Sequence, residues 1–400
     1  MTQAVDKKHF QVLIVGGGTA GLTVAARLCR APQAPEIGII EPSEKHYYQP
    51  LWTLVGGGVC KKEVTQRSQL SVTPKGATWV HDAVAEFFPE ENAVSTVSGQ
   101  RLTYDYLVVA PGIQLDWDKI PGLKENIGTG GLCSNYSYAT VDSTWENIRN
   151  FEGGTAIFTH PNTPIKCGGA PQKIMYLAAD YWRNNPPKRD YEIIFCIATP
   201  KIFAVERYAN TLLKVIERYG IEVRYQHDLT AIDASARDAT IKRLGTEDEI
   251  TLPYSMMHVT PPMSAPDFIK RSPLANEGGW VAADKETLQH PKFSNVFALG
   301  DASALPTSKT GAAIRKQAPT VAANLLSAMD QHPLSSRYDG YTSCPLVTGY
   351  GKLVMAEFDY DGNPQETFPI DQSKERRSMY FVKKHLLPRL YWDGMLKGRA

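Results

Sequence analysis

Two cysteines stand in settings that favour redox chemistry. Cys167 lies in a loop beside Lys166, shortly before the start of an expected helix. A neighbouring cation and the positive end of a helix both favour the thiolate, which is the nucleophilic form of cysteine. Cys344 precedes Pro345 in a stretch that predicts a polar loop, and it is the candidate partner. A thiolate of this kind can act as a nucleophile towards a neighbouring redox group.

The remaining cysteines do not suggest a framework of structural disulfides. All six in the chain are scattered, without a C-x-x-C pair or zinc-ligand spacing, so neither a disulfide scaffold nor a metal site is expected. Cys29 and Cys196 fall inside an expected helix and an expected strand and are predicted to be core residues. Cys60 stays undecided.

A pattern typical of a nucleotide-binding fold begins near the N-terminus. Residues 12–15 form an apolar run that predicts a buried strand, and G-x-G-x-x-G follows directly. Gly16 allows the tight turn, Gly18 lets the backbone approach a pyrophosphate, and Gly21 lets the next helix pack closely on the strand. This pattern predicts a dinucleotide-binding βαβ unit.

The rest of that unit is in register with the glycines. A helix expected from about Ala20 to Cys29 directs its free N–H groups at the pyrophosphate. Residues 37–40 predict the next strand, and Glu41 ends it, where an acid can hold a ribose hydroxyl. The aromatic-rich loop over 44–63 either covers a ring system or packs in the core; both alternatives stay open.

Two later segments resemble the other parts of an FAD domain. The strand expected over 106–110 ends before Gly112, and a short strand in 293–301 ends in Gly300-Asp301, where the aspartate would accept a hydrogen bond from the ribityl chain. Residues 307–310 are expected to cap a helix over 311–317, and Pro319 should kink or interrupt it. The predicted FAD-binding residues are Gly16, Gly18, Ala20, Gly21, Glu41, Gln49, Ala83, Gly112, Asp301, Lys309 and Thr310.

A second βαβ unit has lost the nucleotide fingerprint. A strand over 156–159 leads into the loop that carries Cys167, and a helix with Pro171 in its first turn follows. The turn has no G-x-G-x-x-G, and the next strand, 191–197, ends without an acid. In NADH-dependent relatives this turn delivers nicotinamide to the flavin. The thiol of Cys167 would therefore occupy the place of the hydride donor.

These patterns predict an α/β fold with two Rossmann-like domains. Residues 1–120 and 271–335 form the split FAD domain, residues 121–270 form the inserted second domain, and residues 336–400 form a C-terminal region with Cys344. Residues 120–150 resemble a linker between the domains, and residues 259–262 a return hinge. With 42% hydrophobic residues, 21% charged residues and a net charge of +1, the composition is that of an ordinary globular protein and does not favour nucleic acid.

The tail from Lys374 interleaves basic residues with aromatic and aliphatic ones. This pattern favours a helix in a membrane interface, and docking on the protein or on a dimer partner is the alternative. No stretch is apolar enough to span a bilayer. Lys7 and Lys8 before an apolar run superficially resemble a signal peptide, but the run is the nucleotide-binding strand, so no export or transit signal is expected.

Four stretches resemble sulfide:quinone oxidoreductases, especially the branch with the mitochondrial enzyme, and the resemblance covers nearly the whole chain. They are His46-Tyr47-Tyr48-Gln49-Pro50, residues 164–173 around Cys167, His258-Val259-Thr260-Pro261-Pro262-Met263 and Tyr341-Thr342-Ser343-Cys344-Pro345-Leu346.

The resemblance implies that Cys167 and Cys344 are joined by a disulfide or a sulfur bridge. Hydrosulfide would attack Cys344 and leave a persulfide there, and Cys167 would pass electrons to FAD. FAD would reduce a membrane quinone, with Tyr350 and Phe381 as candidates for its site. The resemblance also implies that Cys133 is not catalytic and that FAD is not covalently bound.

The implied partners are sulfide, a sulfane-sulfur acceptor (sulfide, sulfite, cyanide or a small thiol), a quinone and a membrane surface. A homo-oligomer is also open, and the expected location is the cytoplasmic face of a bacterial inner membrane. The alternatives are an NADH:quinone oxidoreductase, a sulfide dehydrogenase flavoprotein subunit and a redox sensor that uses its disulfide as a switch.

Overall fold

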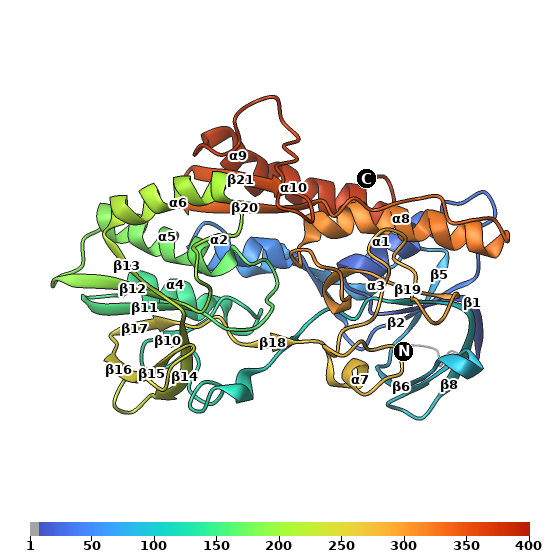
Figure 1. Cartoon of the computed structure of the whole chain (residues 1–400), viewed down its shortest axis with the longest axis horizontal. Helices are drawn as coiled ribbons and strands as arrows, with labels where there is room; N and C mark the ends of the chain where they lie inside the picture. The colour runs from blue at the N-terminus through green and yellow to red at the C-terminus, as the bar shows by residue number, and fades with distance from the viewer. Residues whose placement is uncertain (1–7) are drawn as a thin grey trace.

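A computed structural model of the chain describes residues 8–400 and shows two α/β lobes with the C-terminal segment lying across both (Figure 1). Lys7, part of the N-terminal pattern, lies outside the described residues. Within residues 8–400, no helix is both long enough and apolar enough to cross a bilayer.

The first lobe is built on a sheet with the strand order β5-β2-β1-β8-β7-β6, and β19 pairs with β8. Its strands are β1 (His9–Val15), β2 (Ile37–Ile40), β5 (Ala77–Val80), β6 (Val84–Phe88), β7 (Ala93–Thr96), β8 (Arg101–Val109) and β19 (Val296–Ala298). Strands β5, β2, β1, β8 and β19 run parallel, as the predicted βαβ pattern requires. Because β19 returns to this sheet after the second lobe, the first lobe is made from two separate segments of the chain.

Helices α1 (Thr19–Leu28) and α8 (Gly311–Met329) lie side by side over this sheet (Figure 1). The helix expected over 311–317, with Pro319 kinking or interrupting it, is longer than predicted: it continues to Met329 with the proline inside, so Pro319 does not interrupt it. A proline within a helix lacks an N–H donor and crowds the carbonyl four residues earlier, but the buried residues Ala318, Val321 and Leu325 hold the helix on the core.

The second lobe has a fully parallel sheet with the order β10-β17-β11-β12-β13 and a small antiparallel sheet below it. The strands are β10 (Leu132–Cys133), β11 (Gly154–His160), β12 (Tyr191–Ile197), β13 (Ile221–Tyr225), β14 (His227–Asp233), β15 (Asp238–Arg243), β16 (Glu249–Pro253) and β17 (Met256–His258). The helices are α4 (Val141–Arg149), α5 (Ala170–Asn184) and α6 (Glu206–Tyr219). The expected linker over 120–150 was wrong in part, because β10 and α4 belong to this lobe.

Two short strands join the lobes. β9 (Gln114–Leu115) pairs antiparallel with β18 (Met263–Ser264), so the chain leaves and re-enters the first lobe at one place (Figure 1). Residues 259–262 lead into β18, where a return hinge was expected. The exact domain boundaries stay a prediction.

The C-terminal region begins with a hairpin. Cys344 was expected in a polar loop, and this was wrong: it lies in β20 (Thr342–Gly349), fully buried, paired with Ala356 of β21 (Lys352–Phe358). Pro345 is tolerated because β20 pairs with only one neighbour. The tail is a helical run made of α9 (Arg377–Phe381), η6 (Val382–Leu386), α10 (Leu387–Arg389), η7 (Leu390–Gly394) and η8 (Met395–Lys397).

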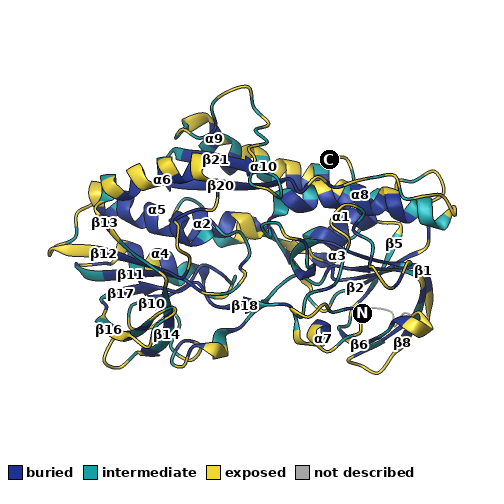
Figure 2. Cartoon of the chain, in the orientation of Figure 1, coloured by how far each residue is buried: buried dark blue, intermediate teal, exposed yellow. Residues whose placement is uncertain are grey.

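Buried residues fill the layers between each sheet and its helices, and exposed residues line the outer turns (Figure 2). The aromatic loop after Glu41 contributes to this core, since His46, Tyr48 and Trp52 are all buried. The short strands and α-helices not yet named are β3 (Lys45–Tyr47), β4 (Gln66–Ser68), α2 (Trp52–Gly56), α3 (Gln69–Val72) and α7 (Asp267–Lys270).

Candidate active site

The two candidate cysteines meet at the junction of the lobes and the C-terminal hairpin. The Sγ atoms of Cys167 and Cys344 are 3.6 Å apart, although 177 residues separate them in the sequence. Cys344 is buried and Cys167 is half-buried. The distance is longer than one S–S bond of about 2.05 Å and shorter than two.

Cys167 is held by backbone hydrogen bonds to two segments. Its φ of +58° places it in the left-handed region, which is uncommon for a residue with a Cβ. Its N–H donates to the Lys309 carbonyl at 2.8 Å, and its own carbonyl accepts from the Ala170 N–H at 2.7 Å, just where α5 begins. The turn of the second lobe is thereby fixed to the segment that follows β19 in the first.

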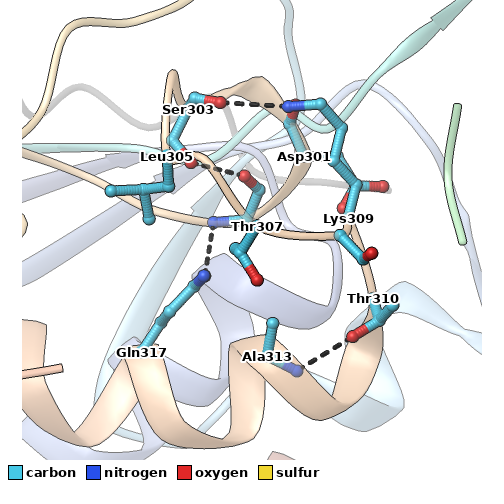
Figure 3. Close-up of a pocket in the computed structure, with 10 residues that line it drawn as sticks. Asp301, Ser303, Leu305, Thr307, Lys309, Thr310, Ala313 and Gln317 are labelled. Atoms are coloured by element: carbon cyan, nitrogen blue, oxygen red, sulfur yellow. Dashed lines mark hydrogen bonds between the residues drawn. The ribbon is translucent and has the colours of Figure 1, made fainter. Parts of the chain in front are cut away.

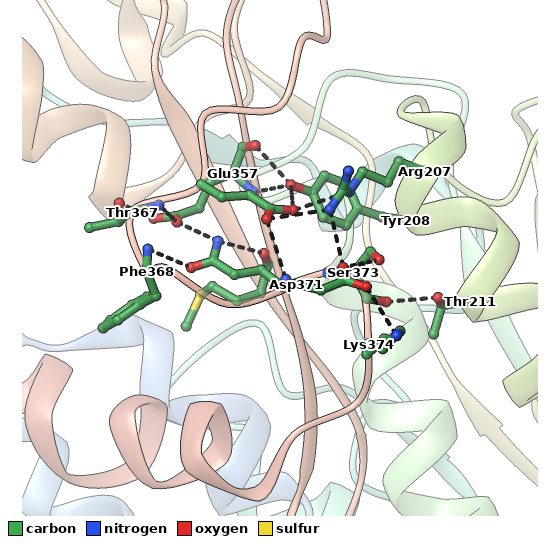
Figure 4. A network of polar contacts seen from close by, with 12 residues as sticks. Arg207, Tyr208, Thr211, Glu357, Thr367, Phe368, Asp371, Ser373 and Lys374 are labelled. Carbon is green, nitrogen blue, oxygen red and sulfur yellow. Dashed lines mark hydrogen bonds and ion pairs between the residues drawn. The ribbon is translucent and has the colours of Figure 1, made fainter.

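Cys344 is held by the hairpin, whose opposite face is fixed by a buried carboxylate (Figure 4). Glu357, opposite Ser343 in the register, accepts hydrogen bonds from Tyr341, from both the N–H and the hydroxyl of Thr367, and from Gln372. Neutral donors satisfy this charge, so the carboxylate costs less than an unpaired buried ion. The segment over 359–376 is thus fastened to the strand next to Cys344.

Lys173, rather than Lys166, is the cation on the thiol. Its Nζ donates to the Cys167 Sγ at 3.1 Å, one turn into α5. The contact with Cys344 and the charge of Lys173 hold the pKa of Cys167 well below its usual range, while the contact with Cys167 and burial raise the pKa of Cys344. The expectation that Lys166 favours the thiolate was wrong, because its Nζ donates to Gln49 and to the Tyr136 carbonyl instead.

Three further lysines are desolvated around this point. Burial lowers the pKa of Lys166 and of Lys309 to about 8, with Asp301 opposing the shift in both. Lys383 of the tail is only 3% exposed and donates to the Pro50 carbonyl at 2.6 Å. Burial and the nearby Lys173 lower its pKa to about 7. These desolvated ammonium groups lack full counter-charge, so a small anion bound here would stabilise their charged forms.

The glycine-rich turn after β1 is closely packed at two glycines and open at the third. A Cβ on Gly16 would lie 2.4 Å from the Ala110 carbonyl oxygen, and one on Gly21 would lie 1.9 Å from that of Gly16. A Cβ on Gly18 would meet nothing within 4 Å. α1 starts without an acidic residue in its first turn and without a side-chain cap, so its N-terminus suits a phosphate.

Glu41 reaches back to that turn. Its two carboxylate oxygens accept the N–H groups of Gly17 and Ser43, both at 2.8 Å, and burial raises its pKa. A carboxylate oxygen has more than one lone pair, so capacity remains for a ribose hydroxyl.

Gly300 and Asp301 lie beside the glycine-rich turn, since a Cβ on Gly300 would contact the Ala20 Cβ at 3.1 Å. Figure 3 shows this corner. Lys309 donates to the carbonyls of Asp301 and Ser303, and the Thr310 hydroxyl caps α8 by accepting from the Ala313 N–H. Burial raises the pKa of Asp301.

A family profile described as pyridine nucleotide-disulphide oxidoreductase matches residues 10–142. The chain is 49% identical over 393 residues to the mitochondrial sulfide:quinone oxidoreductase of Mus musculus, which covers 98% of this chain and 87% of that protein. It is 47% identical to the protein of the same name from Dictyostelium discoideum, with the same coverage. The chain belongs to the sulfide:quinone oxidoreductase family.

The predicted family and the α/β fold class are therefore confirmed. The crystal structure of the sulfide:quinone oxidoreductase from Aquifex aeolicus superposes with a TM-score of 0.84 over 98% of this chain and 92% of that one. At 18% identity this comparison speaks for the fold alone.

The other predicted residues of this sulfide:quinone oxidoreductase family member are spread more widely. Gly112 has a φ of +82° and open space at its Cβ position, whereas Ala83 uses its N–H in a turn with Asp82. The Tyr350 hydroxyl donates to the Gly57 carbonyl at 2.6 Å, and Phe381 is exposed on the tail.

The remaining cysteines lie apart from the sulfur pair. Cys133 is fully buried in β10, Cys196 is buried in β12, Cys29 ends α1, and Cys60 is half-buried. Among residues 8–400, no group of three or more His, Cys, Asp or Glu side chains could hold a metal ion.

Sequence reasoning missed two residues of the site, Lys173 and Lys383. The position of Lys173 along the chain gave a usable signal. It lies one helical turn after Ala170, the first residue of α5, and this spacing places it on the same side of the helix as the turn that carries Cys167. No local signal could have identified Lys383, because its burial depends on the tail docking against Pro50.

Proposed function

We propose that this chain oxidises sulfide and passes the two electrons through FAD to a membrane quinone. The observation that carries the proposal is the 3.6 Å approach of the Cys167 and Cys344 sulfur atoms, in a βα turn that lacks the glycine fingerprint of a nucleotide site. The curated relatives named sulfide:quinone oxidoreductase support the same conclusion.

The described residues fit FAD. The open space at Gly18 and the uncapped N-terminus of α1 suit the pyrophosphate, Glu41 suits the ribose, and Asp301 suits the ribityl chain. Gly112 offers a second place where a backbone approaches without a side chain in the way. FAD supplies a two-electron acceptor that can reduce quinone. Non-covalent binding is part of the proposal, since the predicted contacts need no cysteine.

The sulfur step starts from a disulfide or a sulfur-bridged link between the two cysteines. For the disulfide, hydrosulfide attacks the Cys344 sulfur and forms a new S–S bond. The Cys167–Cys344 bond breaks, and its electron pair leaves with Cys167 as a thiolate. A nucleophile then bonds to the sulfane sulfur, which breaks the S–S bond at Cys344 and leaves a second thiolate. Re-forming the Cys167–Cys344 disulfide releases two electrons, which FAD would accept. The nucleophile, which is the sulfane-sulfur acceptor, is sulfide, sulfite, cyanide or a small thiol.

The charges around the pair support this order of events. Lys173 stabilises the Cys167 thiolate as the leaving group, because its ammonium donates directly to that sulfur. The desolvated lysines 166, 309 and 383 favour the binding of hydrosulfide, an anion near neutral pH, because a bound anion stabilises their charged forms.

The tail supports peripheral attachment to a membrane. Its docked face includes Tyr391, Trp392 and Met395, which are buried, while Phe381, Leu386 and Leu390 are exposed on the same helical run. Both alternatives for the tail thus find support: one face packs on the protein, and the other suits a lipid interface. Quinone would be reached from that side.

The compartment and the assembly belong to this proposal too. The cytoplasmic face of a bacterial inner membrane remains the prediction from the sequence, whereas the curated relatives carry "mitochondrial" in their names. A homo-oligomer also remains a prediction.

An anaerobic sulfide titration tests the proposal. Sulfide should bleach the flavin absorbance and produce a long-wavelength charge-transfer band, and adding quinone should restore the oxidised spectrum. Reduction by NADH but not by sulfide would favour the NADH:quinone oxidoreductase alternative. Flavin reduction by sulfide without turnover of quinone in detergent would favour a redox sensor.

A separate experiment tests the tail. Truncation before Lys374 should release the protein from vesicles, and so should the variant with Phe381, Leu386 and Leu390 all changed to Ser, which keeps the docked face. Flotation of the triple variant with vesicles to the same extent as the unchanged protein would contradict attachment through this face.

A further inference from the structure

Tyr391 of the tail reaches the glycine-rich turn of the first lobe. It belongs to η7, is only 3% exposed, and lies 372 residues after Thr19, the first residue of α1. Its hydroxyl is 3.0 Å from the Thr19 hydroxyl and also hydrogen-bonds the Nε2 of His46. The tail is thus connected by polar contacts to the loop that would hold a pyrophosphate.

The donor and the acceptor of each hydrogen bond in the series Gly17–His46–Tyr391–Thr19 can be assigned in turn. The Nδ1 of His46 lies 3.1 Å from the Gly17 carbonyl, which can only accept, so Nδ1 carries the proton. Burial lowers the pKa of His46 to about 4, so the ring is neutral and its Nε2 accepts from the Tyr391 hydroxyl. Thr19 must then donate to Tyr391, since the tyrosine proton is already used.

The same glycine is held by two further hydrogen bonds. The Gly17 N–H donates to Glu41 at 2.8 Å, and the Gly17 carbonyl also accepts from the Gln69 side chain at 3.0 Å. A Cβ on Gly17 would overlap both neighbours, at 2.4 Å from the Gln69 amide nitrogen and 2.8 Å from Glu41. The position of the turn is therefore set by side chains, of which Tyr391 is the one supplied by the tail.

Ring contacts fix Tyr391 in place. Its ring centroid is 4.5 Å from that of Tyr48, and the Arg67 guanidinium lies 4.1 Å from the ring centre of Trp392. Further along, a Cβ on Gly398 would lie 2.5 Å from the Ala26 carbonyl of α1, so the tail packs directly on that helix. This end of the tail is part of the first lobe.

We propose that Tyr391 is a positioning residue for FAD: by fixing Thr19 and His46 it holds the glycine-rich turn in the shape that retains the pyrophosphate. The tail would then have two separate tasks, lipid contact through its exposed face and cofactor retention through its docked face. The inference rests on FAD being the cofactor, as proposed above.

The release of FAD from the purified holoprotein tests this inference. Free FAD is more fluorescent than bound FAD in many flavoproteins, so release is followed by fluorescence after dilution. Tyr391→Phe leaves the Thr19 hydroxyl and the His46 Nε2 without their partner in a buried site, and release should become about tenfold faster. The sulfide-induced charge-transfer band should be unchanged while FAD is bound, because Tyr391 does not touch the cysteines.

Tyr208→Phe is the matched control. Tyr208 lies on α6 of the second lobe, and its buried hydroxyl donates to the Glu357 carbonyl of the C-terminal hairpin at 3.0 Å. Its removal should cost similar stability without changing FAD release. Equal release rates for the two variants, or no change in Tyr391→Phe, would overturn the inference.

Thr19 probes the contact from the other side, which keeps the inference testable if Tyr391→Phe does not fold. Thr19→Val should release FAD faster, while Thr19→Ser, which keeps the hydroxyl, should behave like the unchanged protein. Adding Thr19→Val to Tyr391→Phe should give little further loss, because the two variants remove the same hydrogen bond. A fully additive loss would contradict the coupling. If the unchanged protein were purified without any flavin, this would instead contradict the assignment of FAD as the cofactor.

Discussion

The two lobes contain the same βα turn built for different purposes. After β1 the turn is made of glycines, with Gly16 at a φ of +100° and open space at Gly18. After β11 the corresponding turn carries Cys167 at a φ of +58° and leads into α5 with Lys173 in its first turn. The first turn therefore offers backbone to a ligand, and the second offers a charged sulfur.

This difference has a physical basis. Phosphate is bound by N–H groups and a helix dipole, which require the absence of side chains. A nucleophilic thiol needs the opposite, a cation near the sulfur, and Lys173 supplies it at 3.1 Å. One supersecondary unit can thus hold a cofactor or replace one, depending on what occupies its turn.

Removal of either sulfur should have the largest effect. We expect Cys167→Ser and Cys344→Ser each to reduce sulfide-dependent flavin reduction roughly a thousandfold or more, as loss of a nucleophile does in other enzymes. FAD should stay bound in both, as judged by its absorbance. Cys29→Ser, at the end of α1, should react normally, and full activity in either site variant would end the proposed pairing.

Alanine substitutions at glycines should separate the two turns next. Gly18→Ala should fold but bind FAD about ten- to hundredfold more weakly, because its methyl group would enter the space proposed for the pyrophosphate. Gly168→Ala, which also has open space at its Cβ position, should bind FAD normally. Titration of the apoprotein with FAD measures the affinity of both variants. Equal affinities would contradict the prediction that only the turn after β1 binds the pyrophosphate.

Loss of the cation in the second turn should have a smaller effect. Lys173→Met should raise the pKa of Cys167 and slow flavin reduction about tenfold near neutral pH, since a charge-assisted hydrogen bond is lost. The rate should recover as the pH rises and the thiol ionises, and Lys173→Arg should restore part of it. Lys166→Met should leave the pKa of Cys167 unchanged, as measured by the ultraviolet absorbance of the thiolate. A change in that pKa would show that Lys166, and not Lys173 alone, stabilises the thiolate.

The smallest expected effect is on stability. Burial holds the pKa of Lys383 at about 7, below the value of about 10.4 for an unfolded lysine, so between these values the unfolded state binds more protons. The free energy of unfolding should therefore rise with pH in this window, by up to about 1.4 kcal/mol per pH unit from this residue. Lys383→Met should make the slope shallower in urea unfolding. An unchanged slope would mean that the ammonium is solvated.

Much of the fold could be predicted because its signals are local. The run over 12–15, the three glycines and Glu41 predicted β1, the turn and the end of β2, and the strand over 191–197 matches β12 residue for residue. The absence of a fingerprint near Cys167 could also be read directly. The loop expected around Cys344 failed because pairing with β21, rather than local polarity, decides that segment.

The sequence by itself determined the two βα units, the family and the cysteines worth pairing, because periodicity, glycine spacing and motifs are properties of neighbouring residues. Only the tertiary structure decided which lysine faces Cys167, that Lys383 is desolvated, and that Tyr391 meets Thr19. The last two depend on the docking of segments far apart in the chain, and the first depends on distant partners, Gln49 and Tyr136, that hold the Lys166 ammonium elsewhere. Charge, burial and hydrogen bonding at the site depend on that docking, and no local pattern encodes it.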